Sequence, residues 1–310
     1  MPFNLTRRQA LKLIAAGVAT VSLAPQAVLS APGRMVKKPI PASGETIPVI
    51  GMGTWRTFNV GDDEQLRKDR TKVLEAFFEH GGGMVDSSPM YGSGAAVMGF
   101  ALERLGNHDK LFSAEKVWTE DGSKTREQVD EQESLWGIDT FDLMQVHNLA
   151  AWEEHLETLH EMKESGEIRY VGITTSSGRR HREFEQIMEN HDLDFIQVTY
   201  NITHREVEER ILPLAREKDI AVIANRPYDG GDLIRDLKAR ETVPEWAVEE
   251  FDCQGWADFL LKFLVSHPAV TCAIPATTRV DHMHENMKAG HDPMPDSAMR
   301  KRMIEHVESL

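Results

Sequence analysis

Eight short apolar runs recur between residues 49 and 275, and each precedes a longer segment with apolar residues at helical spacing. Runs of this kind, without strict apolar–polar alternation, are typical of parallel strands covered by helices. Eight strand–helix units in succession predict an α/β fold, a (β/α)8 barrel of the TIM-barrel type. The runs span residues 49–55, 84–86, 111–118, 141–147, 168–175, 195–200, 220–224 and 272–275.

A doubly wound parallel sheet is the alternative to a barrel. That fold usually carries a fingerprint of three glycines after its first strand. Here Gly51 and Gly53 are followed by Thr54-Trp55-Arg56, so the third glycine is missing. We therefore expect residues 40–310 to form one barrel, with a C-terminal helix near Ala298–Val307.

Residues 1–30 differ in character from the rest of the chain. Arg7 and Arg8 precede a mildly apolar run from Leu13 to Leu23, and no acidic residue occurs before Glu45. The run is too short to span a bilayer, so we expect no stable membrane insertion. The paired arginines resemble a twin-arginine signal peptide, which predicts recognition by the twin-arginine export machinery and a periplasmic protein exported in the folded state. A frayed or amphipathic N-terminal helix is the alternative.

The charge balance restricts the possible partners. The chain has 35 basic and 50 acidic side chains, a net charge of −15, which argues against nucleic acid as a partner. Only two cysteines occur, Cys253 and Cys272. Two cysteines do not make a disulfide framework, and whether they pair is left open by the sequence.

Four ionisable residues stand at or just after the ends of three neighbouring strands: Asp86, Tyr91, Lys116 and His147. In a barrel of this type, the carboxyl ends of the strands build the active site. A tyrosine can donate a proton if a nearby ammonium lowers its pKa, which Lys116 is expected to do while Asp86 holds it. His147 can orient a carbonyl oxygen by a hydrogen bond. A polarised carbonyl beside a proton donor implies a hydride source, hence a nicotinamide cofactor.

A metal-dependent hydrolase is a competing interpretation of the same strand ends, with Asp86, Glu115 and His147 as ligands. Such enzymes usually have two or more histidines in ligand spacing, and no His-x-His sequence directly follows a strand here. We therefore expect no metal site.

The spacing of these four residues resembles that of the aldo-keto reductase family. Asp86 and the Tyr91-Gly92 pair match the family's Asp-x4-Tyr-Gly motif, and Lys116 and His147 match the other two members of its catalytic tetrad. The resemblance covers about residues 40–290. It implies NAD(P)H-dependent reduction of an aldehyde or ketone to an alcohol. The alternative within the same fold is an NADP(H)-binding sensor or accessory subunit with little turnover.

The resemblance also implies cofactor-binding positions, some of which depart from the family pattern. Thr175 replaces an asparagine amide, Asn225 replaces an aromatic residue that stacks on the nicotinamide, with Tyr228 as a possible substitute, and Ala276 replaces a lysine. Arg279 could bind a 2′-phosphate, so NADP(H) is favoured and NAD(H) remains open. The full set is Gly53, Thr54, Trp55, Thr174, Thr175, Gln197, Asn225, Arg226, Thr277, Thr278, Arg279, Glu285 and Asn286. The substrate is not identified by the sequence.

Overall fold

Eight parallel strands form the central barrel in a computed structural model that describes residues 35–106 and 108–310. The sheet runs without a break from β3 to β10, and a parallel bridge between Ile50 and Ala273 brings its two edges together. The expected (β/α)8 fold is thereby confirmed, whereas the predicted signal peptide lies outside the described residues. The strands are β3 (Met52–Gly53), β4 (Met84–Asp86), β5 (Phe112–Val117), β6 (Phe141–His147), β7 (Ile168–Thr174), β8 (Phe195–Thr199), β9 (Ala221–Asn225) and β10 (Cys272–Ala273).

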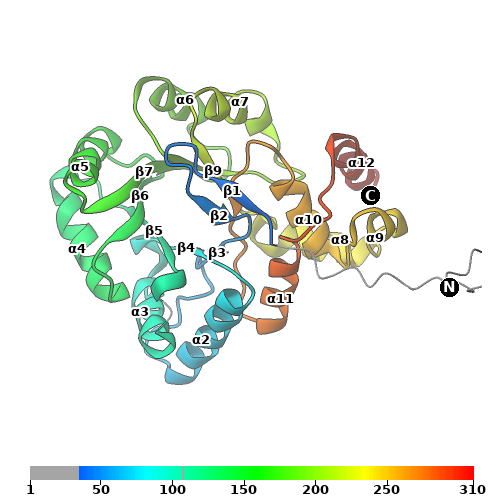
Figure 1. Ribbon diagram of the computed structural model, residues 1–310, viewed down its shortest axis with the longest axis horizontal. Coiled ribbons are helices and arrows are strands. Elements are labelled where there is room, and N and C mark those ends of the chain that lie inside the picture. Colours follow the sequence, from blue (N-terminus) through cyan, green and yellow to red (C-terminus); the bar gives the residue numbers. More distant parts are fainter. Residues whose placement is uncertain (1–34, 107) are drawn as a thin grey trace, which may run out of the picture. The chain divides into compact units, whose positions relative to one another are not determined.

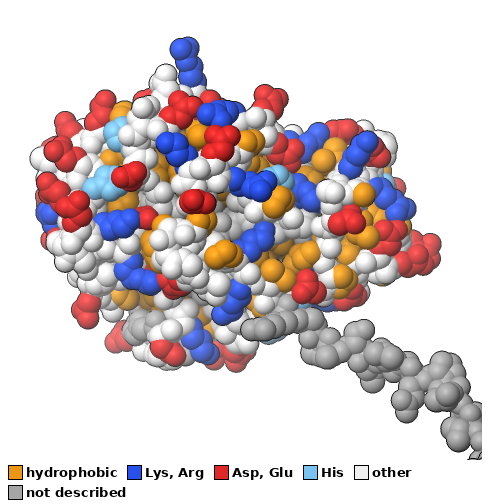
Figure 2. Space-filling view, turned by 45° about the horizontal axis from the view of Figure 1, so that its top comes forward, with side chains coloured by type: hydrophobic (Ala, Val, Ile, Leu, Met, Phe, Trp, Pro, Cys, Tyr) orange, Lys and Arg blue, Asp and Glu red, His pale blue; other side chains and the backbone are white. Residues whose placement is uncertain are grey.

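Helices surround the barrel in chain order, as Figure 1 shows. They are α2 (Glu64–Glu79), α3 (Gly94–Leu105), α4 (Thr125–Trp136), α5 (Trp152–Ser165), α6 (His181–Asn190), α7 (Ile211–Glu217), α8 (Asp232–Arg240), α9 (Glu245–Phe251), α10 (Trp256–Val265), α11 (Val280–Lys288) and α12 (Ser297–Glu308). None of the helices within the described ranges is long and apolar enough to cross a membrane. Acidic and basic side chains are interspersed on the face seen in Figure 2.

The amino-terminal end of the barrel interior is filled by apolar side chains. Successive residues of a strand point to opposite faces, so every second residue of each strand enters the barrel. A hairpin of β1 (Lys37–Pro39) and β2 (Thr46–Pro48) lies over the middle of the ring of helices in Figure 1. It adds Ile40 and Ile47 to this cluster. The sequence interpretation did not include the hairpin. The strand residues of the cluster include Met84, Phe112, Leu143, Tyr170 and Phe195.

Polar side chains occupy the carboxyl end of the same interior. Gln145 and His147 follow Leu143 at intervals of two along β6, so all three share the inner face, and β6 changes from apolar to polar along its length. Gly172 on β7 leaves room for this change. A Cβ atom there would lie 2.8 Å from the Phe195 carbonyl oxygen and 3.2 Å from Cγ of Gln145. The apolar end of the barrel interior therefore contributes to the stability of the fold, and the carboxyl end carries the ionisable groups.

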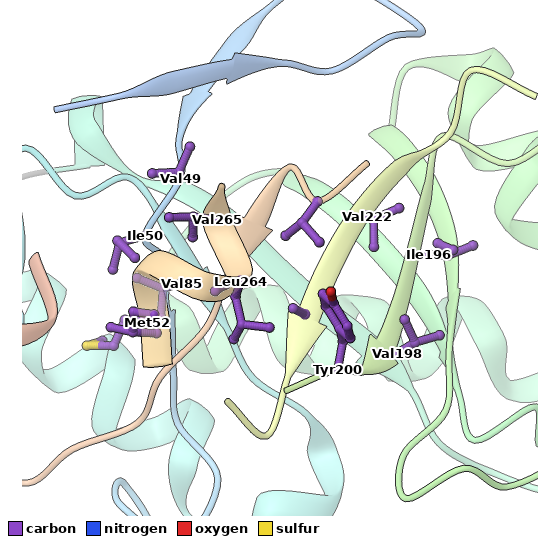
Figure 3. Packing of buried hydrophobic residues seen from close by; sticks show 14 of the residues in the cluster. Val49, Ile50, Met52, Val85, Ile196, Val198, Tyr200, Val222, Leu264 and Val265 are labelled. Carbon is purple, nitrogen blue, oxygen red and sulfur yellow. The ribbon is translucent and has the colours of Figure 1, made fainter. Parts of the chain in front are cut away.

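The outward-facing strand residues pack under the helices. Figure 3 shows Leu264 and Val265 of α10 among strand residues such as Val85 and Val222. All four side chains are almost completely buried. Each such side chain contributes about 1.5–3 kcal/mol to folding relative to an exposed one. This layer fixes the strands, and with them the strand ends.

Two of the predicted strands are shorter than expected. Within the run 49–55, only β3 is a strand. Within the run 272–275, only β10 is a strand, since Pro275 has no N–H to donate to a neighbouring strand. The segment between Asp229 and Glu250 contains α8 and most of α9, and the expected C-terminal helix is α12. Both cysteines are buried and unpaired.

The hairpin is expected to stabilise the barrel from its closed end. Replacing Ile40, which is fully buried, by alanine should lower the free energy of unfolding by about 2–4 kcal/mol, because it leaves a cavity beneath the barrel interior. Urea denaturation measures the change. The control is Leu66→Ala, at an exposed position of α2, and its free energy of unfolding should stay within about 0.5 kcal/mol of that of the unmodified chain. Equal effects of the two changes would contradict this role of the hairpin.

Candidate active site

The carboxylate of Asp86 lies at the centre of the polar end of the barrel. It ends β4, is 2% exposed, and pairs with the fully buried ammonium of Lys116 from β5 at 2.8 Å and 2.7 Å. Oδ1 also accepts hydrogen bonds from Nε2 of Gln145 at 3.2 Å and from Nε2 of Gln197 at 2.7 Å. Side chains of four strands thus converge on one carboxylate. Its charge is compensated by an ion pair and two amides, as a buried charge requires.

The three N–H groups of Lys116 all have acceptors. Two point to the oxygens of Asp86 and the third to the backbone carbonyl of Ser87 at 2.5 Å. None is left to donate to the Tyr91 hydroxyl, although Nζ lies 5.5 Å from the centroid of the Tyr91 ring. Lys116 therefore makes no hydrogen bond to Tyr91 and contributes to the site by fixing Asp86.

Tyr91 ends a short 3-10 helix, Pro89–Tyr91, directly after β4, and its ring lines the cavity described below. Burial raises the pKa of this phenol well above its usual value of about 10, and the negative charges of Asp86 and Glu115 raise the pKa further. The expectation that Lys116 lowers the pKa of Tyr91 is therefore wrong for this structure, because burial and the charges of Asp86 and Glu115 all raise that pKa. The phenol is protonated at neutral pH.

His147 ends β6, and its ring packs edge-on against Tyr91 with centroids 5.9 Å apart. Its Nδ1 lies 2.7 Å from Oγ of Ser88. Burial lowers the pKa of His147 to about 3, and the positive charges of Lys116 and Arg179 act in the same direction. The imidazole is therefore neutral at neutral pH. A neutral imidazole can donate one hydrogen bond without carrying a charge into the site.

Glu115 lies on the opposite face of β5 from Lys116. Its carboxyl accepts hydrogen bonds from the Lys116 backbone N–H at 2.9 Å and from the Trp136 indole at 3.1 Å, under α4. Burial raises its pKa to about 8. The ligand set Asp86, Glu115 and His147 of the hydrolase hypothesis is therefore not assembled. Within the described ranges, no group of three or more His, Cys, Asp or Glu side chains could hold a metal ion.

A cavity of about 330 Å³ opens above Asp86, Tyr91 and His147. Seven of the predicted cofactor positions line it: Gly53, Thr54, Trp55, Thr174, Gln197, Asn225 and Arg226. Arg226 lies over the Trp55 ring at 5.6 Å, and Arg56 lies over the same ring at 4.1 Å. The cavity, which Arg179 also lines, therefore combines an aromatic wall, three guanidinium groups and the ionisable groups of the strand ends.

Several lining residues are already committed to one another. Gln197, besides donating to Asp86, accepts from Thr174 Oγ1 at 3.2 Å and from Asn225 Nδ2 at 3.4 Å. Asn225 also accepts from Thr199 Oγ1 at 2.7 Å. Thr175, which does not line the cavity, donates its hydroxyl to the Arg179 carbonyl at 2.8 Å. That hydroxyl keeps only its acceptor capacity for a carboxamide.

The remaining predicted cofactor residues lie outside the cavity lining, either just before α11 or within it: Thr277, Thr278, Arg279, Glu285 and Asn286. Arg279 pairs with Asp281 through two hydrogen bonds, so its guanidinium is not free as expected. Tyr228, the expected substitute for the stacking aromatic residue, donates its hydroxyl to Oδ1 of Asn286 at 2.6 Å. Because Tyr228 lines the cavity and Asn286 is buried behind it, this bond connects the cavity wall to α11.

The sequence interpretation missed four residues that contact the site: Ser88, Gln145, Arg56 and Arg179. Two signals were available. Gln145 stands two residues before His147 on the same strand face, and Ser88 stands two residues after Asp86 in the motif itself. No local pattern indicated the two arginines, which reach the cavity from loops.

Comparisons with known proteins agree with this geometry. The model of the aldo/keto reductase family matches residues 49–303. Methylglyoxal reductase YeaE of Escherichia coli is 27% identical over 259 residues, which cover 81% of this chain and 89% of that protein. An NADH-specific methylglyoxal reductase of the same organism is 28% identical over 246 residues, covering 68% of this chain and 72% of that protein.

Solved structures show the same fold. The aldo/keto reductase from Klebsiella pneumoniae in complex with NADP and acetate superposes with a TM-score of 0.72 at 22% identity, covering 88% of this chain and 96% of that one. The holo form of AKR11C1 from Bacillus halodurans has the same TM-score at 21% identity, with the same coverage. The family model spans most of the barrel, and Asp86, Tyr91, Lys116 and His147 lie within the residues that it matches. The chain therefore belongs to the aldo/keto reductase family and is an NAD(P)H-dependent oxidoreductase.

Proposed function

We propose that this enzyme reduces a small aldehyde or ketone, with Tyr91 as proton donor and His147 as the group that orients the carbonyl. The observation that carries the proposal is the juxtaposition of a protonated phenol, a neutral imidazole and a buried Asp86–Lys116 pair at one cavity. A carbonyl oxygen in this cavity would meet two neutral donors and no free negative charge.

The lining residues fit a nicotinamide dinucleotide. The donors of Thr174 and Asn225 are already hydrogen-bonded within the protein, but their oxygens keep acceptor capacity for the N–H groups of a carboxamide. The positive φ angles of Gly230 and Gly231 let the backbone approach a phosphate closely. Arg56 and Arg226 supply positive charge at the same wall. When bound, the reduced nicotinamide supplies a hydride to the carbonyl carbon.

The chain's own residues then manage the proton. As negative charge develops on the substrate oxygen, His147 stabilises it by a hydrogen bond and Tyr91 gives up its hydroxyl proton. The raised pKa of Tyr91 is compatible with this step, because the alkoxide formed is a far stronger base than a phenolate. Lys116 contributes to this step by holding Asp86 and the Ser87 carbonyl in place, since its N–H groups are committed to them.

A small substrate is favoured by the volume of the cavity. About 330 Å³ must hold both the nicotinamide and the reacting carbonyl. The relatives from Escherichia coli are named methylglyoxal reductases, which makes short oxoaldehydes the first substrates to test. NADP(H) is favoured over NAD(H), although the pairing of Arg279 with Asp281 weakens the basis for that preference.

Replacing Tyr91 by phenylalanine tests the proton donor. The change should lower kcat for reduction of methylglyoxal or another small aldehyde by about 10²–10⁴-fold, because the general acid is lost, with NADPH affinity unchanged. NADPH absorbance follows turnover, and NADH in a parallel series measures the cofactor preference. Tyr170→Phe is the matched control, since the Tyr170 hydroxyl bonds to Ser43 and Glu45 at the closed end of the barrel.

Two results would go against the proposal. Turnover by Tyr91→Phe within threefold of the unmodified enzyme would exclude Tyr91 as the proton donor. Tight NADPH binding without turnover of any aldehyde or ketone by the unmodified chain would favour the accessory-subunit alternative.

We infer further that the protein is exported folded to the periplasm through the twin-arginine machinery, with its cofactor already bound. The Arg7-Arg8 pair and the mildly apolar run Leu13–Leu23 support this proposal. A periplasmic reductase has no obvious supply of free NADPH, so a cofactor acquired before export would resolve the difficulty.

Changing both arginines to lysine, Arg7→Lys with Arg8→Lys, should abolish export while leaving the enzyme active in the cytoplasm. Cell fractionation with immunoblotting measures where the protein accumulates, and nucleotide analysis of the periplasmic protein shows whether a cofactor travels with it. Lys12→Arg, which preserves charge outside the pair, is the control. Equal periplasmic amounts of the double variant and the unmodified chain would contradict the proposed route.

A further inference from the structure

A hydrogen bond joins the buried side chains of Ser88 and His147, and the other partners of Ser88 bear on its direction. Oγ of Ser88 lies 2.7 Å from Nδ1 of His147 and also accepts a hydrogen bond from the Met90 backbone N–H at 3.2 Å. Ser88 is 1% exposed and is not part of the cavity lining. Its hydroxyl therefore has to find every partner inside the protein.

Two arrangements of the protons are possible. If Nδ1 carried the imidazole proton, Oγ would accept from both Nδ1 and Met90, and its own proton would need a third partner. Residues 35–106 and 108–310 offer no other partner to that oxygen. A buried donor without an acceptor destabilises the arrangement that contains it, because its lost hydration is not replaced. If Ser88 instead donates to Nδ1 while it accepts from Met90, all of these groups are satisfied.

We propose that Ser88 is a positioning residue, whose hydroxyl donates to Nδ1 of His147 and thereby places the imidazole proton on Nε2. This inference rests on the proposed function, in which His147 donates a hydrogen bond to the substrate carbonyl. Nε2 has no hydrogen-bond partner among the residues described here, and the His147 ring lines the cavity. With the proton on Nε2, the ring offers a donor to the substrate oxygen; with the proton on Nδ1, it would offer a lone pair and repel that oxygen.

The same serine connects the two groups that act on the oxygen. Its side chain caps the 3-10 helix Pro89–Tyr91, at whose end Tyr91 lies, and the cap acts through the Met90 N–H. One hydroxyl therefore holds the start of the turn that carries the proton donor and sets the tautomer of the orienting imidazole. Lys116 and Arg179 disfavour a second proton on this ring, so a choice between two neutral tautomers is the relevant one.

Nitrogen-15 NMR of the histidine-labelled full chain tests the tautomer directly. The His147 signals are identified by their absence in His147→Gln. We expect an unprotonated Nδ1 and a protonated Nε2 in the unmodified protein, and a shift toward a mixture of tautomers in Ser88→Ala. In kinetics, Ser88→Ala should lower kcat roughly tenfold with little change in KM, since only part of the population keeps the productive tautomer.

Two further variants separate tautomer control from simple loss of packing. Ser88→Thr keeps the hydroxyl and should retain the tautomer. Ser113→Ala removes another buried serine hydroxyl, which bonds to Asp142 away from the site, and should leave both the His147 signals and kcat unchanged. A protonated Nδ1 in the unmodified protein, or unchanged His147 signals in Ser88→Ala, would overturn the proposal. The expected tautomer in a protein without carbonyl turnover would instead count against the proposed function alone.

Discussion

The ion pair between Asp86 and Lys116 is the interaction on which the site depends. Both groups are almost completely buried, and removing one partner of such a pair typically costs about 3–5 kcal/mol because the other charge stays behind uncompensated. Gln145 and Gln197 bond to the same carboxylate, so β4, β5, β6 and β8 are held together at their carboxyl ends. Because the charges of Asp86 and Lys116 compensate each other, Tyr91 and His147 stand beside the pair as neutral hydrogen-bond donors.

The barrel separates stability from chemistry along its axis. Its amino-terminal end is closed by the β1–β2 hairpin and filled with apolar side chains, and its carboxyl end carries the polar network. This division allows buried charges at one end of a single interior, since the apolar end and the helix layer contribute folding free energy that offsets their desolvation cost. Gly172 marks the transition, because a side chain there would displace Gln145.

The barrel and the convergence of Asp86, Tyr91, Lys116 and His147 could be predicted from sequence, because strand periodicity places strand-end residues at one rim. The direction of individual hydrogen bonds could not. Whether Lys116 donates to Tyr91 or to Ser87 depends on rotamers within the folded core, and the pKa of Tyr91 depends on burial and neighbouring carboxylates that only the folded chain brings to it. The pairing of Arg279 with Asp281 and the contact of Ser88 with His147 likewise depend on side-chain geometry. The hairpin was missed because its strands have three residues each and carry little periodicity.

The pH dependence of kcat/KM for aldehyde reduction, at saturating NADPH, tests the central claim that Tyr91 works as a half-buried, protonated phenol beside a Lys116 ammonium that is paired with Asp86. The raised pKa of Tyr91 predicts a rate that stays level as the pH rises from 6.5 to about 9, because the phenol keeps its proton throughout. Glu115 ionises in this pH range, and its negative charge makes loss of the Tyr91 proton less favourable. A fall in kcat/KM with an apparent pKa between 7 and 8, absent from the residual activity of Tyr91→Phe, would mean that Lys116 does lower the pKa of the phenol and would contradict this account.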